Sequence, residues 1–404
     1  MKIQKIILAI LASASIGVAN AGEVTGLTSF TGGSKAVASE VNGNFTAVKT
    51  AVDDNNAKIA DLEARLAALE ANTVIGLDGK VFFQTFNGMP EVRFHGVNVK
   101  ITNDTGDTDT MNGVGNLVIG YNTERTTGND KTGSHNLVVG DNHNFSSYGG
   151  IVAGQENTIS GASASVTGGQ FNTASGLRSS VSGGQNNLAS QNWSSVSGGK
   201  ANTAMGVYSS VSGGRDNTAV QVATSVSGGS NNEAGDITCD PINCPNDLNA
   251  SISGGTNNKA TGLNASISGG GGNLASAEKA SVSGGALNQA TALNASISGG
   301  AVNIASNSNA SVSGGFDNDA TGFAASVTGG QNNTAGGQYA SVSGGESNSA
   351  SGVSASVSGG QLNTATGDRS SVNGGINCNL AGALKWGVGL DNNPFIGCSG
   401  TLAN

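Results

Sequence analysis

Few side chains in this 404-residue chain are of the types that perform acid–base or metal chemistry. The histidines are His95, His135 and His143, and the pair Asp141-x-His143 is more typical of loop polarity than of a metal site. Serine is abundant, but no Gly-x-Ser-x-Gly elbow stands with a histidine and an acid as partners. The glycine-rich units also lack the lysine and the following helix of a phosphate loop. We therefore expect no catalytic activity, no cofactor and no bound metal ion.

The composition indicates how such a chain can fold. Only 36% of the residues are hydrophobic and 4% aromatic, whereas glycine supplies 65 residues. These values provide too little bulk for ordinary globular cores, and the fixed repeats described below argue against low-complexity disorder. We infer that regular repetition replaces bulk in the core.

The first 21 residues have the pattern of a secretory signal peptide. Lys2 and Lys5 precede an apolar run from Ile6, and Ala19-Asn20-Ala21 is a small-x-small cleavage site before Gly22. The alternative is a membrane anchor, but the run is short for a span and no later stretch approaches one. We expect a secreted or cell-surface protein. Cleavage removes two lysines and no acid, so the formal charge changes from −9 to −11, which disfavours nucleic acid as a partner.

The four cysteines form an even set that suits an oxidising compartment. Cys239 and Cys244 lie in the one long insertion of the repeat region, and Cys378 and Cys398 lie near the C-terminus. Proximity in the sequence predicts the pairs Cys239–Cys244 and Cys378–Cys398. The alternative is four free, buried thiols.

A heptad pattern follows a linker at residues 22–40 and predicts a coiled coil at 41–75. Apolar residues recur in alternating steps of four and three, interrupted by a single asparagine, and a lone polar residue in such a seam fixes register and strand number. The alternative is one amphipathic helix on a globular core. The residues expected to drive oligomerisation are Val48, Val52, Asn55, Ile59, Leu62, Leu66 and Leu69.

Residues 76–113 alternate apolar with polar residues and are interrupted at Asn87-Gly88 and at Gly96. This pattern predicts two or three short strands joined by turns. We interpret the segment as an adaptor between the helix and the repeats.

The main feature is an array at 114–382 with a period of 15 residues. Fourteen units run from Val166 to Val372, with one longer step of 26 that places an insert at about 233–247. Counting each unit from its Val or Ile as position 0, serine stands at −1 and glycine at +2 and +3. Asparagine stands at +6 and alanine at +8 in the first thirteen units. The segments NLVIG, NLVVG and GIVAG resemble three irregular turns before the array, and 383–404 is expected to form a C-terminal cap.

A constant period of this length predicts a solenoid in which each turn is buried against its neighbours. The Ser-Val-Ser alternation predicts one short strand per turn with the valine inward, and the glycine pair permits a bend. Asparagine at +6 can stack on itself from turn to turn as an amide ladder. The fold class is therefore an all-β parallel solenoid with a helix before it.

The units SSVSGGKANTAMGVYS, with the leading NLVIGYN and NLVVGDN, resemble the head repeats of YadA-like trimeric autotransporter adhesins. The resemblance covers about residues 114–382 and implies a left-handed parallel β-roll intertwined as a homotrimer. Asn55 is similar to the polar residues in the trimeric stalks of that family. The chain departs from the family because its coil precedes the roll and its C-terminal sequence does not match the β-barrel anchor. We expect no membrane span in the mature chain.

The variable positions lie at the bends, at +4 and +5 and at +11 and +12. Aromatic and arginine side chains often anchor interfaces, and on a solenoid they form files about 4.8 Å apart per turn. They could also only shield the bends or pack between chains. The ligand-contact candidates are Arg178, Trp193, Tyr208 and Tyr339 at +12, with Arg369 at the same position, and Lys200 and Arg215 at +4.

Three classes of function remain after these exclusions. The leading one is a trimeric adhesin-like fibre that binds an extracellular glycan, a matrix component or a cell-surface ligand. The second is an ice- or polysaccharide-binding solenoid, because rows of hydroxyls at −1 and +1 could match a regular lattice. The third is a structural sheath or matrix component.

Overall fold

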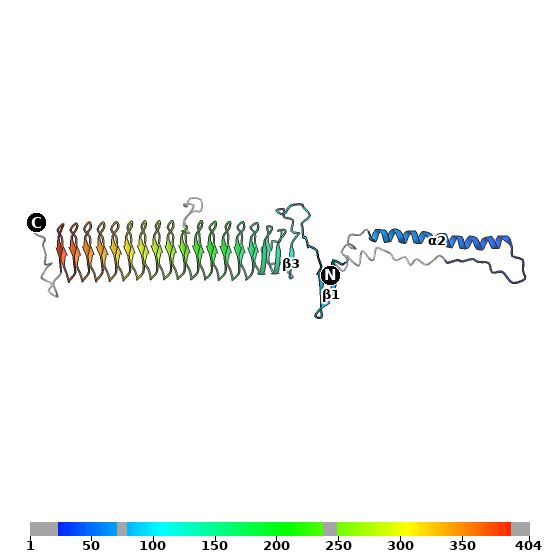
Figure 1. Ribbon diagram of the computed structural model, residues 1–404, viewed down its shortest axis with the longest axis horizontal. Coiled ribbons are helices and arrows are strands. Elements are labelled where there is room, and N and C mark those ends of the chain that lie inside the picture. Colours follow the sequence, from blue (N-terminus) through cyan, green and yellow to red (C-terminus); the bar gives the residue numbers. More distant parts are fainter. Residues whose placement is uncertain (1–22, 71–78, 237–248, 389–404) are drawn as a thin grey trace. The chain divides into compact units, whose positions relative to one another are not determined.

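The computed structural model describes residues 23–70, 79–236 and 249–388. The chain divides into two compact units, one ending at Lys100 and the other beginning at Ile101. The first contains a helix and a hairpin, and the second is the repeat array (Figure 1).

Helix α2 spans Ala38–Glu70 and so begins three residues before the predicted coiled coil. The predicted end at 75 lies outside the described residues. The preceding segment is attached to the helix through Asn44, whose side-chain oxygen accepts the backbone N–H of Thr28 at 2.7 Å. The same amide donates to the carbonyl of Thr28 at 2.9 Å. Part of the predicted linker is therefore bound to the helix.

Strands β1 (Val81–Phe86) and β2 (Met89–Phe94) form an antiparallel hairpin. Asn87 and Gly88 both have positive φ, 50° and 80°, as a two-residue hairpin turn with two left-handed residues requires. The predicted break at Asn87-Gly88 is confirmed, and the described part of the adaptor contains two strands rather than three.

The second unit is a parallel β-solenoid of about sixteen turns, as predicted (Figure 1). Each regular turn adds one strand to each of two ladders, with residue i paired to residue i+15. We call the ladder that carries position 0 the valine sheet. Its strands are β3 (Leu117–Ile119), β4 (Leu137–Asp141), β6 (Ile151–Gln155), β8 (Ser165–Val166), β10 (Ser180–Val181), β12 (Ser195–Val196), β14 (Ser210–Val211), β16 (Ser225–Val226), β18 (Ser251–Ile252), β20 (Ser266–Ile267), β22 (Ser281–Val282), β24 (Ser296–Ile297), β26 (Ser311–Val312), β28 (Ser326–Val327), β30 (Ser341–Val342), β32 (Ser356–Val357), β34 (Ser371–Val372) and β36 (Trp386–Gly387).

The other ladder, the alanine sheet, carries positions +7 and +8. Its strands are β5 (Asn144–Phe145), β7 (Thr158–Ile159), β9 (Thr173–Ala174), β11 (Leu188–Ala189), β13 (Thr203–Ala204), β15 (Thr218–Ala219), β17 (Glu233–Ala234), β19 (Lys259–Ala260), β21 (Leu274–Ala275), β23 (Gln289–Ala290), β25 (Ile304–Ala305), β27 (Asp319–Ala320), β29 (Thr334–Ala335), β31 (Ser349–Ala350), β33 (Thr364–Ala365) and β35 (Asn379–Leu380). The prediction of one strand per turn was wrong, because the inward Asn at +6 and Ala at +8 alternate with an outward residue at +7 in the same way as Ser-Val-Ser.

The core of each turn is narrow. Val211 at position 0 and Ala219 at +8 are at most 1% exposed, and so is Ser209 at −2. Burying one valine contributes only about 2 kcal/mol, so hydrogen bonds between turns must supply much of the order.

The predicted amide ladder supplies such bonds. The backbone N–H of Asn217 donates to the side-chain oxygen of Asn202 at 3.1 Å. The Asn217 amide nitrogen donates to the carbonyl oxygens of Gly213, at 2.9 Å, and Gly229, at 3.0 Å. One asparagine thus joins three successive turns, and it is fully buried. The prediction of a stacked ladder is confirmed.

The paired glycines are not equivalent. Gly214 at +3 has φ +85°, and a Cβ built there would lie 2.1 Å from the carbonyl oxygen of Gly229 in the next turn. A Cβ on Gly213 at +2 would meet nothing within 4 Å. Only the second glycine is therefore required by the packing of one chain.

Two boundaries differ from the prediction. Glu233 and Ala234 form β17, so the first residues of the predicted insert still belong to a regular turn. Lys259 on the following turn pairs with Glu233 at 2.9 Å and links the turns on either side of the insertion. At the other end, Trp386 and Gly387 pair with β34, so the roll continues beyond 382 into the predicted cap. The ladder extends to Trp386 and Gly387 because its hydrogen bonds are made by the backbone and do not require the Ser-Val sequence.

Candidate functional site

The bends of the roll are built from left-handed residues. Positions +5 and +12 have φ between 52° and 60° in most units, although few of these residues are glycine. In the chain order of one turn, +4 and +5 lead from the valine sheet to the alanine sheet, and +11 and +12 lead back. We call these the +5 edge and the +12 edge. They lie on opposite sides of the roll's cross-section.

The +12 edge carries a stacked aromatic pair. The rings of Trp193 and Tyr208 lie on adjacent turns with centroids 5.0 Å apart and planes inclined by 13°. Their backbones are fixed by bonds to the preceding turn, from Trp193 N–H to the carbonyl of Leu177 at 2.9 Å and from Tyr208 N–H to that of Asn192 at 3.1 Å. Trp193 is 38% exposed and Tyr208 58%. Two predicted candidates therefore form one rigid, accessible unit.

The neighbours of this pair along the +12 edge differ in character. Arg178 occupies the turn before Trp193 and is exposed, whereas Ala223 occupies the turn after Tyr208. Because the side chain of Ala223 is only a methyl group, it covers little of the Tyr208 ring on the side that faces the turn of Ala223. The edge thus presents a cation, two stacked rings and an open step in sequence. This arrangement can stack against an apolar sugar face or bind an anionic group.

Tyr339 belongs to a second aromatic pair, farther along the +12 edge. Its ring lies 5.6 Å from that of Phe323, at 88°, in an edge-to-face contact. Phe323 stands at +11 and was not among the predicted contact residues, although its position at a variable bend could have indicated it. Arg369 lies two turns beyond Tyr339 and is exposed.

Lys200 and Arg215 do not lie with the aromatic residues. They are neighbours at +4 on the +5 edge, where a bridge pairs their backbones. Arg215 also forms an ion pair with Asp216 at 3.3 Å. The structure therefore divides the predicted ligand-contact residues between two edges.

The outer face of the valine sheet is uniform. Serine fills −1 in all fourteen units, and serine or threonine fills +1 in thirteen. With the glycine column at +2, these rows form an uncharged hydroxyl surface whose rows repeat about every 4.8 Å. The outer positions of the alanine sheet are mixed and include Leu274, Asp319 and Thr334 at +7. A lattice could match only the first of these faces.

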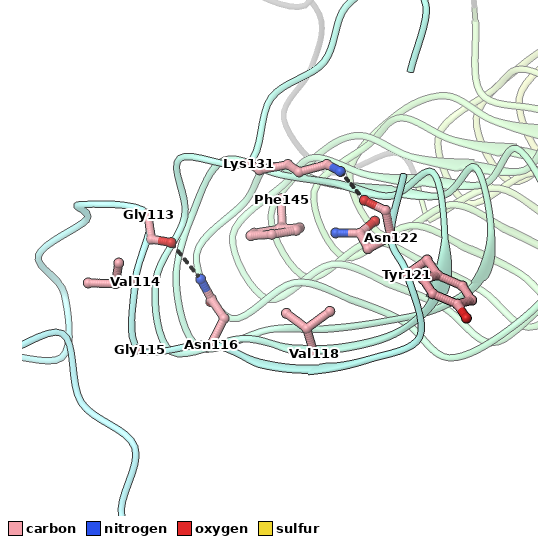
Figure 2. A pocket seen from close by; sticks show the side chains of 9 residues that line it. All are labelled: Gly113, Val114, Gly115, Asn116, Val118, Tyr121, Asn122, Lys131 and Phe145. Atoms are coloured by element: carbon pink, nitrogen blue, oxygen red, sulfur yellow. Dashed lines mark hydrogen bonds between the residues drawn. The ribbon is translucent and has the colours of Figure 1, made fainter. Parts of the chain in front are cut away.

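The N-terminal mouth of the roll holds a pocket of about 430 Å³ (Figure 2). Val118 occupies the place of a core valine but is 44% exposed, whereas Phe145 behind it is 3% exposed. Lys131 donates to the backbone carbonyl of Asn122 (Figure 2). It also donates to the backbone carbonyl of Thr123 at 3.1 Å. The pocket is the open end of the core rather than a converging set of reactive groups.

His143 lies beside this pocket, and its assignment to loop polarity was wrong. The residue is 0% exposed, and both ring nitrogens have hydrogen-bond partners in the backbone. Burial lowers the pKa of His143 below its ordinary value. Asp141 is bound instead by the N–H and hydroxyl of Thr123, and these bonds lower the pKa of its carboxyl. His135 lies nearer the surface, where its Nε2 accepts the backbone N–H of Asn103 at 3.2 Å.

Of the cysteines, only Cys378 lies among the described residues. It is 0% exposed at the +6 position of the last unit, where its backbone N–H donates to Asn363 at 2.9 Å. Cys239, Cys244 and Cys398 lie outside the described residues. Both predicted disulfide pairings remain predictions.

In the described segments, no three His, Cys, Asp or Glu side chains converge as a metal site would require. No helix within residues 23–70, 79–236 and 249–388 is long and apolar enough to cross a membrane. Comparison of the sequence with models of protein families and with curated proteins gave no match.

Proposed function

We propose that this chain is an exported, non-catalytic fibre protein that assembles as a homotrimer and attaches to an extracellular glycan, matrix or cell-surface ligand. The observation that carries the proposal is the uncovered apolar seam of α2. Its side chains are 42 to 54% exposed in the single chain: Val48, Val52, Ile59, Leu62 and Leu66.

An exposed seam of this length on a 33-residue helix requires a partner. The seam follows heptad spacing, and coiled-coil association buries such positions as knobs in the holes of neighbouring helices. Asn55 interrupts the apolar series and would fix the register of the associated helices. Parallel association of identical helices would align the rolls that follow, so each turn would face its own counterpart.

The hydroxyl face supports close association of the rolls. Glycine at +2 recurs in every unit, although one chain has room for a Cβ at each of these positions. Glycine allows another backbone to approach closely, and a partner that needs it at every turn must share the period of the roll. A second copy of the same roll has that period.

The +12 edge supports attachment. Weak contacts of Trp193 and Tyr208 with a sugar would be multiplied by the chains of one fibre, because linked sites act with raised effective concentration. The test replaces Trp193→Ser and Tyr208→Ser together and measures attachment of the purified protein to cells or matrix. We expect reduced attachment with unchanged melting and mass. Phe171→Ser is the matched control, because Phe171 is an aromatic 41% exposed on the +5 edge.

Unchanged attachment of the double variant would contradict the ligand role of these rings, and a collapsed oligomer would return them to a structural one. The second candidate function, binding to ice or a crystalline polysaccharide, is favoured by the uniform hydroxyl rows. Its test is Ser197→Lys with Ser212→Lys on adjacent turns of that face. Loss of lattice binding, with attachment to cells unchanged, would favour the alternative.

A further inference from the structure

The internal ladder contains one titratable member. From Asn157 to Asn363 every ladder residue is an asparagine whose side-chain oxygen accepts the backbone N–H of the next turn. One step earlier the same place is taken by His143. Its ring nitrogen Nδ1 accepts the backbone N–H of Asn157 at 3.2 Å, and the backbone N–H of His143 donates to the side-chain oxygen of Asn122 at 2.9 Å.

His143 also reproduces the second bond of a ladder asparagine. The amide nitrogen of Asn157 donates to the carbonyl of Ala153, four residues earlier, at 2.7 Å. The Nε2 of His143 lies 3.0 Å from the carbonyl of Val139, again four residues earlier. A backbone N–H can only donate, so Nδ1 carries no proton and Nε2 carries the proton of the neutral ring. The ladder therefore needs one tautomer of an uncharged imidazole.

We propose that His143 is an acid-sensitive link in the ladder, and that its protonation detaches the first two turns of the roll, residues 113–146, from the turns that follow. A protonated Nδ1 would place an N–H against the N–H of Asn157 and remove an acceptor from a fully buried site. The lost bond joins the turn of His143 to the turn of Asn157, so opening there would uncover the core residues of the following turn, Val152 and Ile159.

The charges around the ring favour this response. The Arg125 guanidinium, on the loop after the first turn, bonds the carbonyls of Asn142, at 2.6 Å, and Asn157, at 2.8 Å, and its charge opposes a second cation. Lys131, on the same loop, adds another positive charge. Asp141 and Glu156 are the acids of the adjoining turns. The carboxyl of Asp141 is engaged by Thr123, and Glu156 interacts with the charge of Arg125.

The sign of the pH dependence follows from burial. The closed state holds His143 with a pKa below 6.5, whereas an opened turn exposes a ring with an ordinary value near 6.5. The open state then binds more protons, so the closed state loses stability as the pH falls below about 6.5. The opening equilibrium should rise about tenfold for each pH unit below that point, until the closed state itself is protonated.

The experiment is hydrogen exchange of the full chain between about pH 7.5 and about pH 4.5, corrected for intrinsic exchange rates. In the wild type, protection of a peptide covering 137–146, which includes N–H groups bonded to the following turn, should fall by about tenfold per pH unit in the acid range, while peptides from 196–226 keep theirs. His143→Asn, which restores the usual ladder residue, should keep protection constant across the range. His135→Asn removes the other histidine that accepts a backbone N–H in this region and should behave as the wild type over 137–146.

Constant protection in the wild type, or the same acid response in His143→Asn, would overturn the proposal. If His143→Asn leaves 137–146 unprotected at neutral pH, the ¹⁵N shifts of the wild-type imidazole decide instead. A proton on Nε2 alone at neutral pH, and on both nitrogens only as protection is lost, supports the link. A proton on Nδ1 at neutral pH refutes it.

Discussion

The valine sheet and the +12 edge belong to the same turns but follow different rules. On the sheet, positions −1 to +3 are nearly constant over fourteen units, whereas the +12 edge carries arginine, tryptophan, tyrosine, alanine, asparagine and lysine. The packing of the roll explains why the inward residue at position 0 is constant, because each such side chain packs on the equivalent side chain of the next turn. Outward constancy at +2 is not required by space within one chain, because a Cβ there would meet nothing closer than 3.6 Å. The difference separates positions fixed by the packing of the roll from outward positions that this packing leaves free.

The largest expected effect distinguishes the two glycines of one pair. Gly214→Ala should destabilise the roll by about 3 kcal/mol or more, because its Cβ meets backbone at 2.1 Å and its φ is +85°. Gly213→Ala should change the stability of the single chain by less than about 0.5 kcal/mol and act instead on association. Hydrogen exchange over residues 196–230 measures the first effect, and light scattering the second. Equal losses of local stability for both variants would remove the distinction.

The next effect tests the ladder. Asn217→Ala removes the three side-chain bonds of Asn217, two donated to the carbonyls of Gly213 and Gly229 and one accepted from the backbone N–H of Asn232, which should cost about 2 to 3 kcal/mol. The control is Gln331→Ala, since Gln331 is exposed at a bend. Local exchange protection of the turns at 202, 217 and 232 should fall only in the first variant. A loss below about 0.5 kcal/mol would show that side-chain packing alone holds the turns.

A smaller effect arises at Asp319 on the outer side of the alanine sheet. One of its carboxylate oxygens is the single buried side-chain polar atom without a hydrogen bond in the described residues. Burial, and then the charge of Asp317, raises the pKa of Asp319. Its ionised form is thus disfavoured in the fold, so the wild type should lose stability as the pH rises above 3.8, through the raised pKa.

Asp319→Thr introduces the residue found at +7 in five other units. It should stabilise the roll at neutral pH by about 1 kcal/mol and remove most of this pH dependence. Thermal melting at pH 4 and pH 7 provides the measurement. A variant less stable than the wild type at neutral pH would indicate a partner for the carboxylate that the single chain lacks.

The smallest effect concerns the stacked rings. Double-mutant cycles with Trp193→Ser and Tyr208→Ser should give a coupling of about 0.5 to 1.5 kcal/mol, as for other aromatic pairs. Pairing Phe171→Ser with Tyr208→Ser should give none, because Phe171 lies on the other edge. Zero coupling for the first pair would mean that the rings do not hold each other in place.

Much of the roll could be predicted from the sequence, because a period of 15 with valine, glycine and asparagine in phase leaves few structures. The second strand was missed because the residues at +6 and +8 that alternate with +7 are Asn and Ala, which are depleted in strands. The extension to Trp386 was missed because backbone pairing continues where the sequence motif stops.

The candidate site was predicted in part. Position +12 identified Trp193 and Tyr208, but sequence spacing alone could not place Lys200 and Arg215 on the opposite edge, which depends on where the chain turns. His143 was misjudged because it stands in an irregular unit, outside the 15-residue register. Its spacing of 14 from Asn157, one less than the period, is the signal that links it to the ladder.

The solution mass of the full-length protein tests the central claim most directly. The exposed seam of α2 and the glycine column at +2 predict self-association, and the resemblance to trimeric adhesin heads implies three chains, so light scattering should give three times the chain mass. Leu62→Asp with Leu66→Asp should lower that mass, whereas Glu63→Gln on the helix should not. A mass equal to one chain for the unmodified protein would contradict the account, because the seam would then be exposed without a partner.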